Sequence, residues 1–189
     1  MKIINARKTD APLIARSIMD AVGEEICSGL ATNGHSLDDV ERLFTSLALR
    51  EDSQYSYLNT LTALDDSGKA VGVCVGYDGS RLHELREAFF EEAEKQLGIE
   101  MGDIDDETDS GEFYIDTLAV LPEYRGRGIA SELLRASIRR AEAIGKPAGL
   151  LVDKENTRAR RLYENIGFRK VGERPFCYVM MDHLHFQGS

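Results

Sequence analysis

The sequence predicts a mixed α/β domain, and two observations support this. Runs in which branched and small residues alternate, as in strands, are separated by longer stretches with apolar residues at helical spacing. A strand–turn–helix–strand unit also lies near the centre of the chain, over residues 112–152. Because no repeat or linker marks a second domain in the 189 residues, we expect one domain over residues 1–185. Residues 186–189 are either native or the remnant of a cleavable tag, and they are excluded from the fold prediction.

The first third of the chain predicts a strand followed by two helices. Residues 2–6 form the opening strand. Asp10 then occupies the N-cap position of a helix whose apolar residues recur at helical spacing, namely Ile14, Ile18 and Val22. Ser36 and Asp39 resemble a capping box with aspartate in place of the usual glutamate, and they open the second helix.

The middle third predicts a hairpin, a helix and a further strand. Residues 55–63 and 70–77 have strand composition, and the turn sequence at 65–68 joins them. Residues 81–97 predict a helix, and residues 112–120 predict a strand. Alternation along this strand places three residues on each face: Phe113, Ile115 and Thr117 on one, and Glu112, Tyr114 and Asp116 on the other.

The last third predicts the helix and strands that follow a glycine-bearing turn at 125–128. An apolar stripe over 129–141 indicates a helix, and residues 148–152 indicate a strand. Residues 157–166 predict another helix, and residues 168–182 predict two closing strands.

The charge balance excludes several classes of partner. Counts of 23 Lys plus Arg and 33 Asp plus Glu give a formal net charge of −10, which repels nucleic-acid phosphates and favours a cationic small substrate. The three cysteines, an odd number without a CxxC spacing, are typical of a reducing compartment. The chain shows neither a signal peptide nor an apolar run near the roughly 20 residues that span a bilayer. We therefore expect a cytoplasmic protein, monomeric or homodimeric, that binds neither nucleic acid nor membrane.

The most informative stretch is the turn that follows the strand over residues 112–120. Gly126 and Gly128 let the backbone turn tightly into a helix, and Arg125 and Arg127 add positive charge. Such a turn exposes consecutive N–H groups at the helix N-terminus, where the helix dipole favours an anion. The turn is not a P-loop, which requires Gly-Lys-Ser/Thr, nor a G-x-G-x-x-G motif, whose third glycine is missing. A plain β-to-α loop is the alternative interpretation.

Two motifs in this half of the chain match one known family. Arg125-x-x-Gly128-x-Ala130 resembles the acetyl-coenzyme A signature of the GNAT superfamily of N-acetyltransferases, Gln/Arg-x-x-Gly-x-Gly/Ala. About thirty residues later the superfamily usually carries Asn, then Tyr seven residues on, then Gly-Phe. Here these residues are Asn156, Tyr163, Gly167 and Phe168. The close resemblance covers residues 112–170 and identifies no subfamily.

The resemblance implies both a fold and an activity. The fold is the GNAT fold, with a mixed, mostly antiparallel central sheet flanked by helices. The activity is transfer of an acetyl group from acetyl-CoA to a primary amine of a small molecule or peptide, by direct attack in a ternary complex and without a metal. Backbone amides of 126–131 would hold the pyrophosphate, and the strand at 118–120 would splay from its neighbour and pair with the pantetheine arm. The implied cofactor-binding residues are Leu118, Ala119, Val120, Arg125, Gly126, Arg127, Gly128, Ile129, Ala130, Ser131 and Asn156.

Proton transfer needs an acid and a base. Tyr163 resembles the general acid of the family, and a phenol suits the protonation of a departing thiolate; its place on an apolar helix face also fits a core role. Asn156 either caps this helix or contacts the cofactor arm, and the two roles are compatible. The base that takes a proton from the amine is Asp116, Glu112 or an ordered water.

Two further groups of residues give weaker signals. The acidic residues Asp103, Asp105, Asp106, Glu107 and Asp109 do not fit a calcium loop, because position six is not glycine and position twelve is not glutamate. They form either a solvated loop or a rim that attracts a cationic amine. The histidines His35, His83, His183 and His185 show no metal-ligand spacing, and we expect no metal.

The acceptor is not indicated, although residues 24–56 and 80–111 are expected to shape its pocket. Two other functions are compatible with the turn. One is a non-catalytic module that binds or senses acyl-CoA, and the other is a nucleotide-binding protein. Retention of both Asn156 and Tyr163 favours the enzyme over the first alternative. The second lacks a ribose-binding acidic residue and a P-loop lysine.

Overall fold

A computed structural model describes residues 1–102, 104–177 and 179–188, and these residues form seven strands and six α-helices. The strands are β1 (Lys2–Asn5), β2 (Thr60–Leu64), β3 (Ala70–Asp78), β4 (Phe113–Val120), β5 (Ala148–Val152), β6 (Phe168–Phe176) and β7 (Val179–Phe186). The helices are α1 (Ala11–Val22), α2 (Glu24–Leu30), α3 (Leu37–Leu49), α4 (Leu82–Leu97), α5 (Ile129–Ala143) and α6 (Thr157–Ile166). None of these helices has the length and apolar content needed to cross a membrane.

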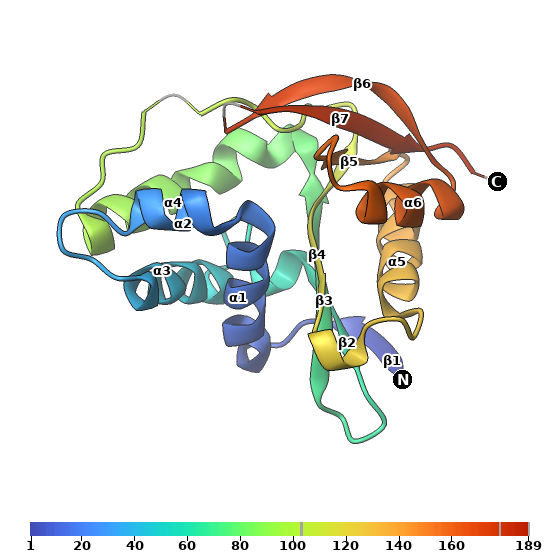
Figure 1. Ribbon diagram of the computed structural model, residues 1–189, viewed down its shortest axis with the longest axis horizontal. Helices are drawn as coiled ribbons and strands as arrows, with labels where there is room; N and C mark the ends of the chain where they lie inside the picture. The colour runs from blue at the N-terminus through green and yellow to red at the C-terminus, as the bar shows by residue number, and fades with distance from the viewer. Residues whose placement is uncertain (103, 178, 189) are drawn as a thin grey trace.

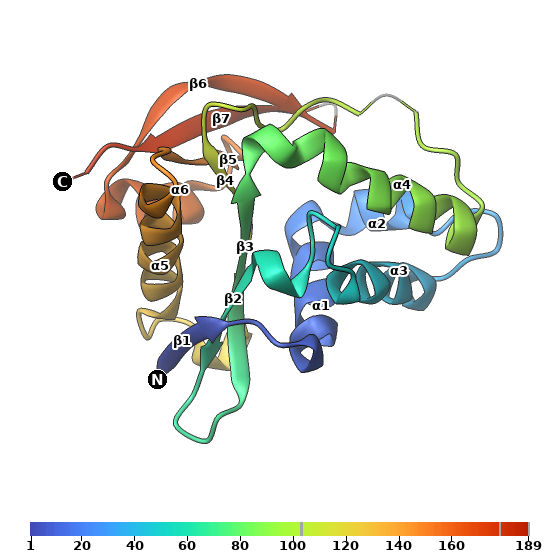
Figure 2. The ribbon, with the colours of Figure 1, turned by 180° about the vertical axis from the view of Figure 1, so that it is seen from behind.

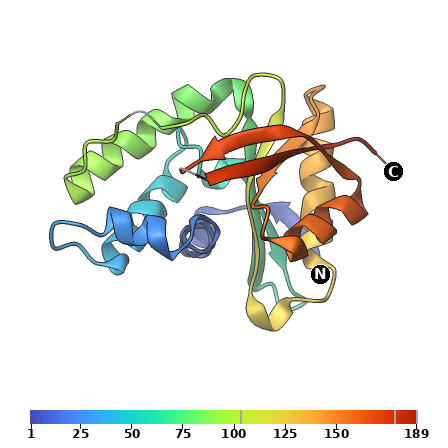
Figure 3. The ribbon, with the colours of Figure 1, turned by 45° about the horizontal axis from the view of Figure 1, so that its top comes forward.

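The strands form one mixed sheet in the order β1-β2-β3-β4-β5-β7-β6. Strands β4 and β5 are parallel, and the other neighbouring pairs are antiparallel. Helices α1–α4 lie on one side of the sheet, and α5 and α6 lie on the other (Figures 1 and 2). The β6–β7 hairpin extends across the end of the sheet above both layers (Figure 3). This arrangement confirms the predicted mixed, mostly antiparallel sheet flanked by helices.

Each face of the sheet is covered by its own apolar core. On one face, Ile14 of α1 and Leu43 of α3 pack with Val75 of β3 and are fully buried. On the other face, Leu133 and Leu134 of α5 pack in a cluster with residues of β2 to β5 and with Phe168. Because both faces are buried, the sheet is a rigid platform, and its open edges and strand ends are the places left for a site.

The predicted N-terminal elements are present, with two differences. The capping box of α3 is confirmed, since the Asp39 N–H donates to Ser36 Oγ at 3.3 Å and the Ser36 N–H donates to Asp39 Oδ2 at 2.7 Å. Asp10 precedes α1 as predicted but does not cap it; its carboxylate instead accepts the backbone N–H of Arg7 at 2.9 Å. Helix α2 was not predicted, because its seven residues are too few to show helical periodicity.

The strand predicted over residues 55–63 begins only at Thr60. Ser56 accepts the backbone N–H of Leu58 at 3.1 Å and thereby caps a 3₁₀ turn at Tyr57–Asn59. Strand-like composition there was misleading because a local side-chain hydrogen bond favours the turn. The segment 50–59 consequently lies as an ordered connection between α3 and β2, next to α4.

Strand β4 contains a β-bulge at Asp116. Val75 of β3 pairs with Thr117, and its neighbour Gly76 pairs with Ile115, so Asp116 has no partner on β3. A bulge shifts the alternation of side chains by one residue. Leu118 therefore packs in the same cluster as Ile115, and Thr117 faces the opposite way. The prediction that Thr117 shares a face with Phe113 and Ile115 is wrong for this reason.

Phe186, the first of the four residues excluded from the fold prediction, is the last residue of β7. Its ring packs edge-on against Phe168, with the ring centroids 5.7 Å apart. Gln187 donates its backbone N–H to the Gly167 carbonyl at 3.1 Å. Ser189 lies outside the described residues.

Candidate active site

A cleft opens where β4 and β5 separate. The two strands pair at Phe113 with Ala148 and at Tyr114 with Gly149, and beyond these residues they no longer pair. From Asp116 to Val120 the edge of β4 that faces β5 is therefore open, as the family resemblance implied. The cleft has a volume of about 660 Å³. Among the predicted site residues, those that line it are Asp116, Leu118, Ala119, Val120, Arg125, Gly126, Gly128, Ile129, Ala130, Ser131, Asn156 and Tyr163.

The glycine turn leaves six consecutive backbone amides free. Gly126 and Gly128 have φ angles of +76° and +79°, which glycine adopts without strain. Helix α5 follows at Ile129 and has no side-chain cap. Among the described residues, no protein group accepts a hydrogen bond from the amides of residues 126–131. Unsatisfied amides at a helix N-terminus favour a bound anion, so the geometry of this turn fits a pyrophosphate.

The two arginines of the turn have different positions. Arg125 lines the cleft, and its Nε donates to the Val120 carbonyl at 2.9 Å, which ties the turn to the end of β4. Arg127 does not line the cleft with its neighbours. Its guanidinium lies over the Tyr124 ring, 5.1 Å from the ring centroid, and donates to the Glu123 carbonyl at 2.9 Å. The backbone N–H of Arg127 is nevertheless one of the six free amides of residues 126–131.

Asp116 has an unusual electrostatic environment. The β-bulge directs this half-buried residue to the wall of the cleft. Burial and the nearby charge of Glu107 raise the pKa of Asp116 to about 7. A carboxylate with a pKa near neutrality is well matched to accept a proton from an ammonium group at physiological pH.

Tyr163 belongs to α6 and Asn156 directly precedes this helix, and both residues line the cleft. The Tyr163 ring is half-buried and packs edge-on against Phe168, with the centroids 6.0 Å apart. Burial raises the pKa of the Tyr163 phenol, which therefore keeps its proton near neutral pH. The Asn156 side chain accepts the Ala159 N–H at 3.1 Å and so caps α6, as the first of its two predicted roles requires. Tyr163 thus packs against the apolar core and also lines the cleft, two positions that the sequence analysis treated as alternatives.

Glu112, the other candidate base, takes part in a buried hydrogen-bond network. It is 1% exposed, and its Oε2 lies 2.8 Å from the Nε2 atoms of both His183 and His185, while Thr108 donates to its Oε1 at 2.7 Å. Burial alone would raise the pKa of Glu112, but hydrogen bonds from His183 and Thr108 outweigh it and lower the pKa. With three partners on its oxygens, Glu112 is a poorer candidate base than Asp116.

The sequence showed no ligand spacing among the histidines, yet the fold brings His183 and His185 together beside Glu112. One ligand atom from each residue lies within 4.8 Å of the others, a separation that would accommodate a metal ion. However, the Nε of Arg174 lies 3.4 Å from His183 Nδ1, and a guanidinium can only donate. With Arg174 donating to Nδ1, the Nε2 atom of His183 donates to Glu112. In this arrangement the three residues form a buried hydrogen-bond network around the Glu112 carboxylate.

The acidic segment is only partly solvated. Glu107 is 4% exposed and forms an ion pair with Arg86, while Asp109 forms an ion pair with Arg174. Asp105 and Asp106 are exposed, and Asp103 lies outside the described residues. The solvated-loop interpretation is therefore wrong for Glu107, because a buried arginine supplies its counter-charge.

Several lining residues were not predicted. Ser17 and Asp20 come from α1, Arg158 comes from the start of α6, and Met181 comes from β7. Arg158 is two residues from the predicted Asn156 and was within reach of motif reasoning, whereas nothing near Asp20 in the sequence marks it. Asp20 and Asp153 add two carboxylates to the lining besides that of Asp116, and Arg125 and Arg158 add positive charge. The lining thus suits an anionic and a cationic ligand at once.

Fold and cleft together define an acyltransferase. The chain belongs to the acetyltransferase (GNAT) family, whose sequence profile matches residues 28–168. No curated protein sequence matches the chain. The crystal structure of an acetyltransferase superposes with a TM-score of 0.80 at 28% identity, covering 100% of both chains.

Two more distant structures show the same fold. An N-acetyltransferase from Staphylococcus aureus Mu50 has a TM-score of 0.76 at 22% identity, over 98% of this chain and 100% of that one. A histone acetyltransferase HPA2 and related acetyltransferase from Corynebacterium glutamicum ATCC 13032 has a TM-score of 0.65 at 20% identity, over 100% and 96%.

Proposed function

We propose that the protein transfers an acetyl group from acetyl-CoA to a primary amine by direct attack in a ternary complex. One observation carries the proposal: the glycine turn with its free amides, the open edge of β4, Asp116 and Tyr163 all contribute to one cleft. The amides would bind the pyrophosphate, and the open edge would hydrogen-bond the pantetheine arm. The reactive thioester would then lie near Leu118, with an amide of β4 stabilising the developing oxyanion.

Asp116 and Tyr163 each take part in one proton transfer. Asp116 takes a proton from the ammonium group of the acceptor, and the freed nitrogen lone pair forms a C–N bond with the carbonyl carbon. As the C–S bond breaks, the sulfur leaves with its electron pair and receives the proton of the Tyr163 hydroxyl. Solvent then takes the second proton that the nitrogen must lose to become a neutral amide, returns a proton to Tyr163 and removes one from Asp116. The products are an N-acetyl amide and the free thiol of CoA.

Thiol release from acetyl-CoA in the presence of a panel of amines tests this function. Tyr163→Phe removes only the hydroxyl, so we expect turnover to fall by about 10²–10⁴-fold, the range of positioned proton transfer. Tyr57→Phe is the matched control, because the Tyr57 hydroxyl contacts Glu51 outside the cleft. A folded Tyr163→Phe variant with the turnover of the control would remove Tyr163 from the mechanism.

A non-catalytic acyl-CoA-binding module is the second candidate, because the free amides alone suffice for binding. It predicts a CoA-dependent rise in melting temperature without thiol release for any amine. The same melting measurement with nucleotides in place of CoA tests the nucleotide-binding alternative.

A further inference from the structure

The glycine turn has few contacts of its own that hold it in place. Residues 125–128 are exposed, and within the described part of the chain no group accepts a hydrogen bond from the amides of 126–131. A Cβ at Gly126 or Gly128 would meet no atom within 4 Å, so neighbouring atoms do not pack closely around these two residues. Ordering a loop upon binding costs free energy. Contacts made by the flanking residues therefore decide how well the amides are arranged before an anion arrives.

Tyr124, the residue before Arg125, connects the turn to the hairpin between β2 and β3. Its hydroxyl donates to Asp65 Oδ2 at 2.9 Å. The Oδ1 atom of Asp65 accepts the backbone N–H of Ser67 at 2.9 Å and that of Lys69 at 3.0 Å. The same carboxylate thus shapes the hairpin turn and holds Tyr124. Hydrogen bonds from Ser67 and Tyr124 lower the pKa of Asp65 to about 2, so this acceptor is ionised near neutral pH.

The Tyr124 ring contacts both the turn and the hairpin through cations. The Arg127 guanidinium lies 5.1 Å from the ring centroid, and the Lys69 ammonium lies 5.5 Å from it. Lys69 also pairs with the Glu123 carboxylate at 3.8 Å. The ring itself is half-buried and lines the cleft. Tyr124 therefore contacts Arg127 inside the turn with its ring and Asp65 on the hairpin with its hydroxyl.

The hairpin is a firm anchor because it is part of the sheet. Strands β2 and β3 pair on either side of its turn, and the Asp65 N–H donates to the Lys69 carbonyl at 2.9 Å. The Leu121 N–H donates to the Val71 carbonyl of β3 at 2.9 Å, directly before the 3₁₀ turn Pro122–Tyr124. Both ends of the path from the sheet to Tyr124 are thus fixed by hydrogen bonds.

We propose that Tyr124 is a positioning residue that ties the glycine turn to the β2–β3 hairpin and keeps the amides of residues 126–131 ordered for the pyrophosphate of the cofactor. The inference rests on the proposed function, in which these amides bind that pyrophosphate. Tyr124 takes no part in the proton transfers, because its hydroxyl is bonded to Asp65. Its loss should therefore weaken cofactor binding and leave the chemical step unchanged.

Calorimetry with CoA and steady-state kinetics with acetyl-CoA test this role in the intact protein. Tyr124→Phe keeps the ring and removes the hydroxyl. We expect the Kd for CoA and the KM for acetyl-CoA to rise by roughly 3–10-fold, the scale of one hydrogen bond, with kcat unchanged. In an Asp65→Ala background the same change should have no further effect on Kd, because the partner is already absent. A folded Tyr124→Phe variant with the wild-type Kd would overturn the proposal.

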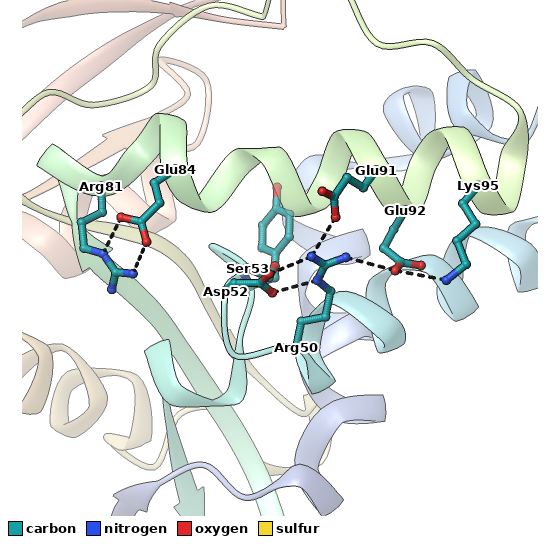
Figure 4. A network of polar contacts seen from close by, with 9 residues as sticks. Arg50, Asp52, Ser53, Arg81, Glu84, Glu91, Glu92 and Lys95 are labelled. Carbon is teal, nitrogen blue, oxygen red and sulfur yellow. Dashed lines mark hydrogen bonds and ion pairs between the residues drawn. The ribbon is translucent and has the colours of Figure 1, made fainter.

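Tyr57→Phe is the matched control, because Tyr57 makes the same two kinds of contact elsewhere. Its hydroxyl donates to Glu51 at 2.9 Å, and the Lys8 ammonium lies 5.4 Å from its ring centroid. The segment that carries Tyr57 is also held on α4 independently of this tyrosine. Figure 4 shows that Arg50 pairs with acidic residues of its own segment and of α4, namely Asp52 at 2.7 Å, Glu91 at 2.8 Å and Glu92 at 3.2 Å. Tyr57→Phe should therefore leave the Kd for CoA unchanged.

Relaxation of ¹⁵N nuclei in the ligand-free protein tests the same role without a substrate. In the wild type, the N–H groups of residues 126–128 should have order parameters near about 0.85, as in rigid backbone. Tyr124→Leu, which also removes the ring, should lower them to below about 0.6, whereas Tyr57→Leu should not. Order parameters that are already low in the wild type, or unchanged in Tyr124→Leu, would overturn the proposal. If the wild-type protein binds no CoA, the proposed function fails, while these order parameters still decide whether Tyr124 holds the turn.

Discussion

Replacing Gly128 with glutamate places a side chain at the N-terminus of α5, within the row of free amides. The protein itself should tolerate the change, because a Cβ at Gly128 would meet no atom within 4 Å. The cost to folding comes from the φ of +79°, where a residue with a side chain loses roughly 1–2 kcal/mol. The variant should therefore fold, with a modestly lower free energy of unfolding.

We expect Gly128→Glu to weaken CoA binding far more than it lowers the free energy of unfolding. A carboxylate beside the amides repels the pyrophosphate and occupies its donors. Each charge-assisted hydrogen bond is worth about 1.5–3 kcal/mol. Loss of two of them costs about 3–6 kcal/mol, which corresponds to a roughly 10²–10⁴-fold weaker Kd.

Isothermal titration calorimetry with CoA measures this loss. Gly34→Glu is the matched control, since Gly34 has a φ of +89° with no atom within 4 Å of its Cβ, and it lies in the connection between α2 and α3. Both variants carry the same strain and the same added charge. If Gly128→Glu binds CoA as tightly as Gly34→Glu does, the amides of residues 126–131 do not hold the pyrophosphate.

Two further predictions concern stability. The pKa of Asp116 is about 7 in the folded protein and about 4 in the unfolded chain, so the protonated carboxyl group stabilises the fold. This contribution to the free energy of unfolding, at most about 4 kcal/mol, is lost as the pH rises from about 4 to about 7. In urea unfolding measured across this pH range, Asp116→Asn should remove the decline, and an unchanged dependence of the free energy of unfolding on pH would refute the prediction. Gly149→Ala places a Cβ against the Glu112 carboxylate and should cost about 3 kcal/mol or more. The control Gly172→Ala, which meets no atom within 4 Å, should cost far less, and equal losses would contradict the packing argument.

Structural features that depend on neighbouring residues in the chain could be predicted from the sequence. The turn at 125–130 and the cap at Asn156 are local, because glycine conformation and side-chain capping depend on a few neighbouring residues. The splaying of the strand at 118–120 from its neighbour followed from the family resemblance. These local signals located the part of the cleft lined by the glycine turn and by Asn156.

Features assembled across the chain could not be predicted in the same way. Gln54 and Glu107 are 53 residues apart and meet only because α4 and β3 bring their segments together. Glu112 meets His183 across 71 residues, which no spacing rule detects. The bulge at Asp116 carries no glycine or proline to mark it, so alternation gave the wrong face for Thr117.

The short ladder between β4 and β5 has a mechanical consequence. Two residue pairs join the part of the sheet formed by β1–β4 to the part formed by β5, β7 and β6, so few ladder hydrogen bonds hold the two parts together. Glu112 lies one residue before the first pair and is hydrogen-bonded to His183 and His185 on β7, so its side chain joins the two parts beside the short ladder. The Glu112 network, although it lies outside the cleft lining, therefore reinforces the junction from which the cleft opens.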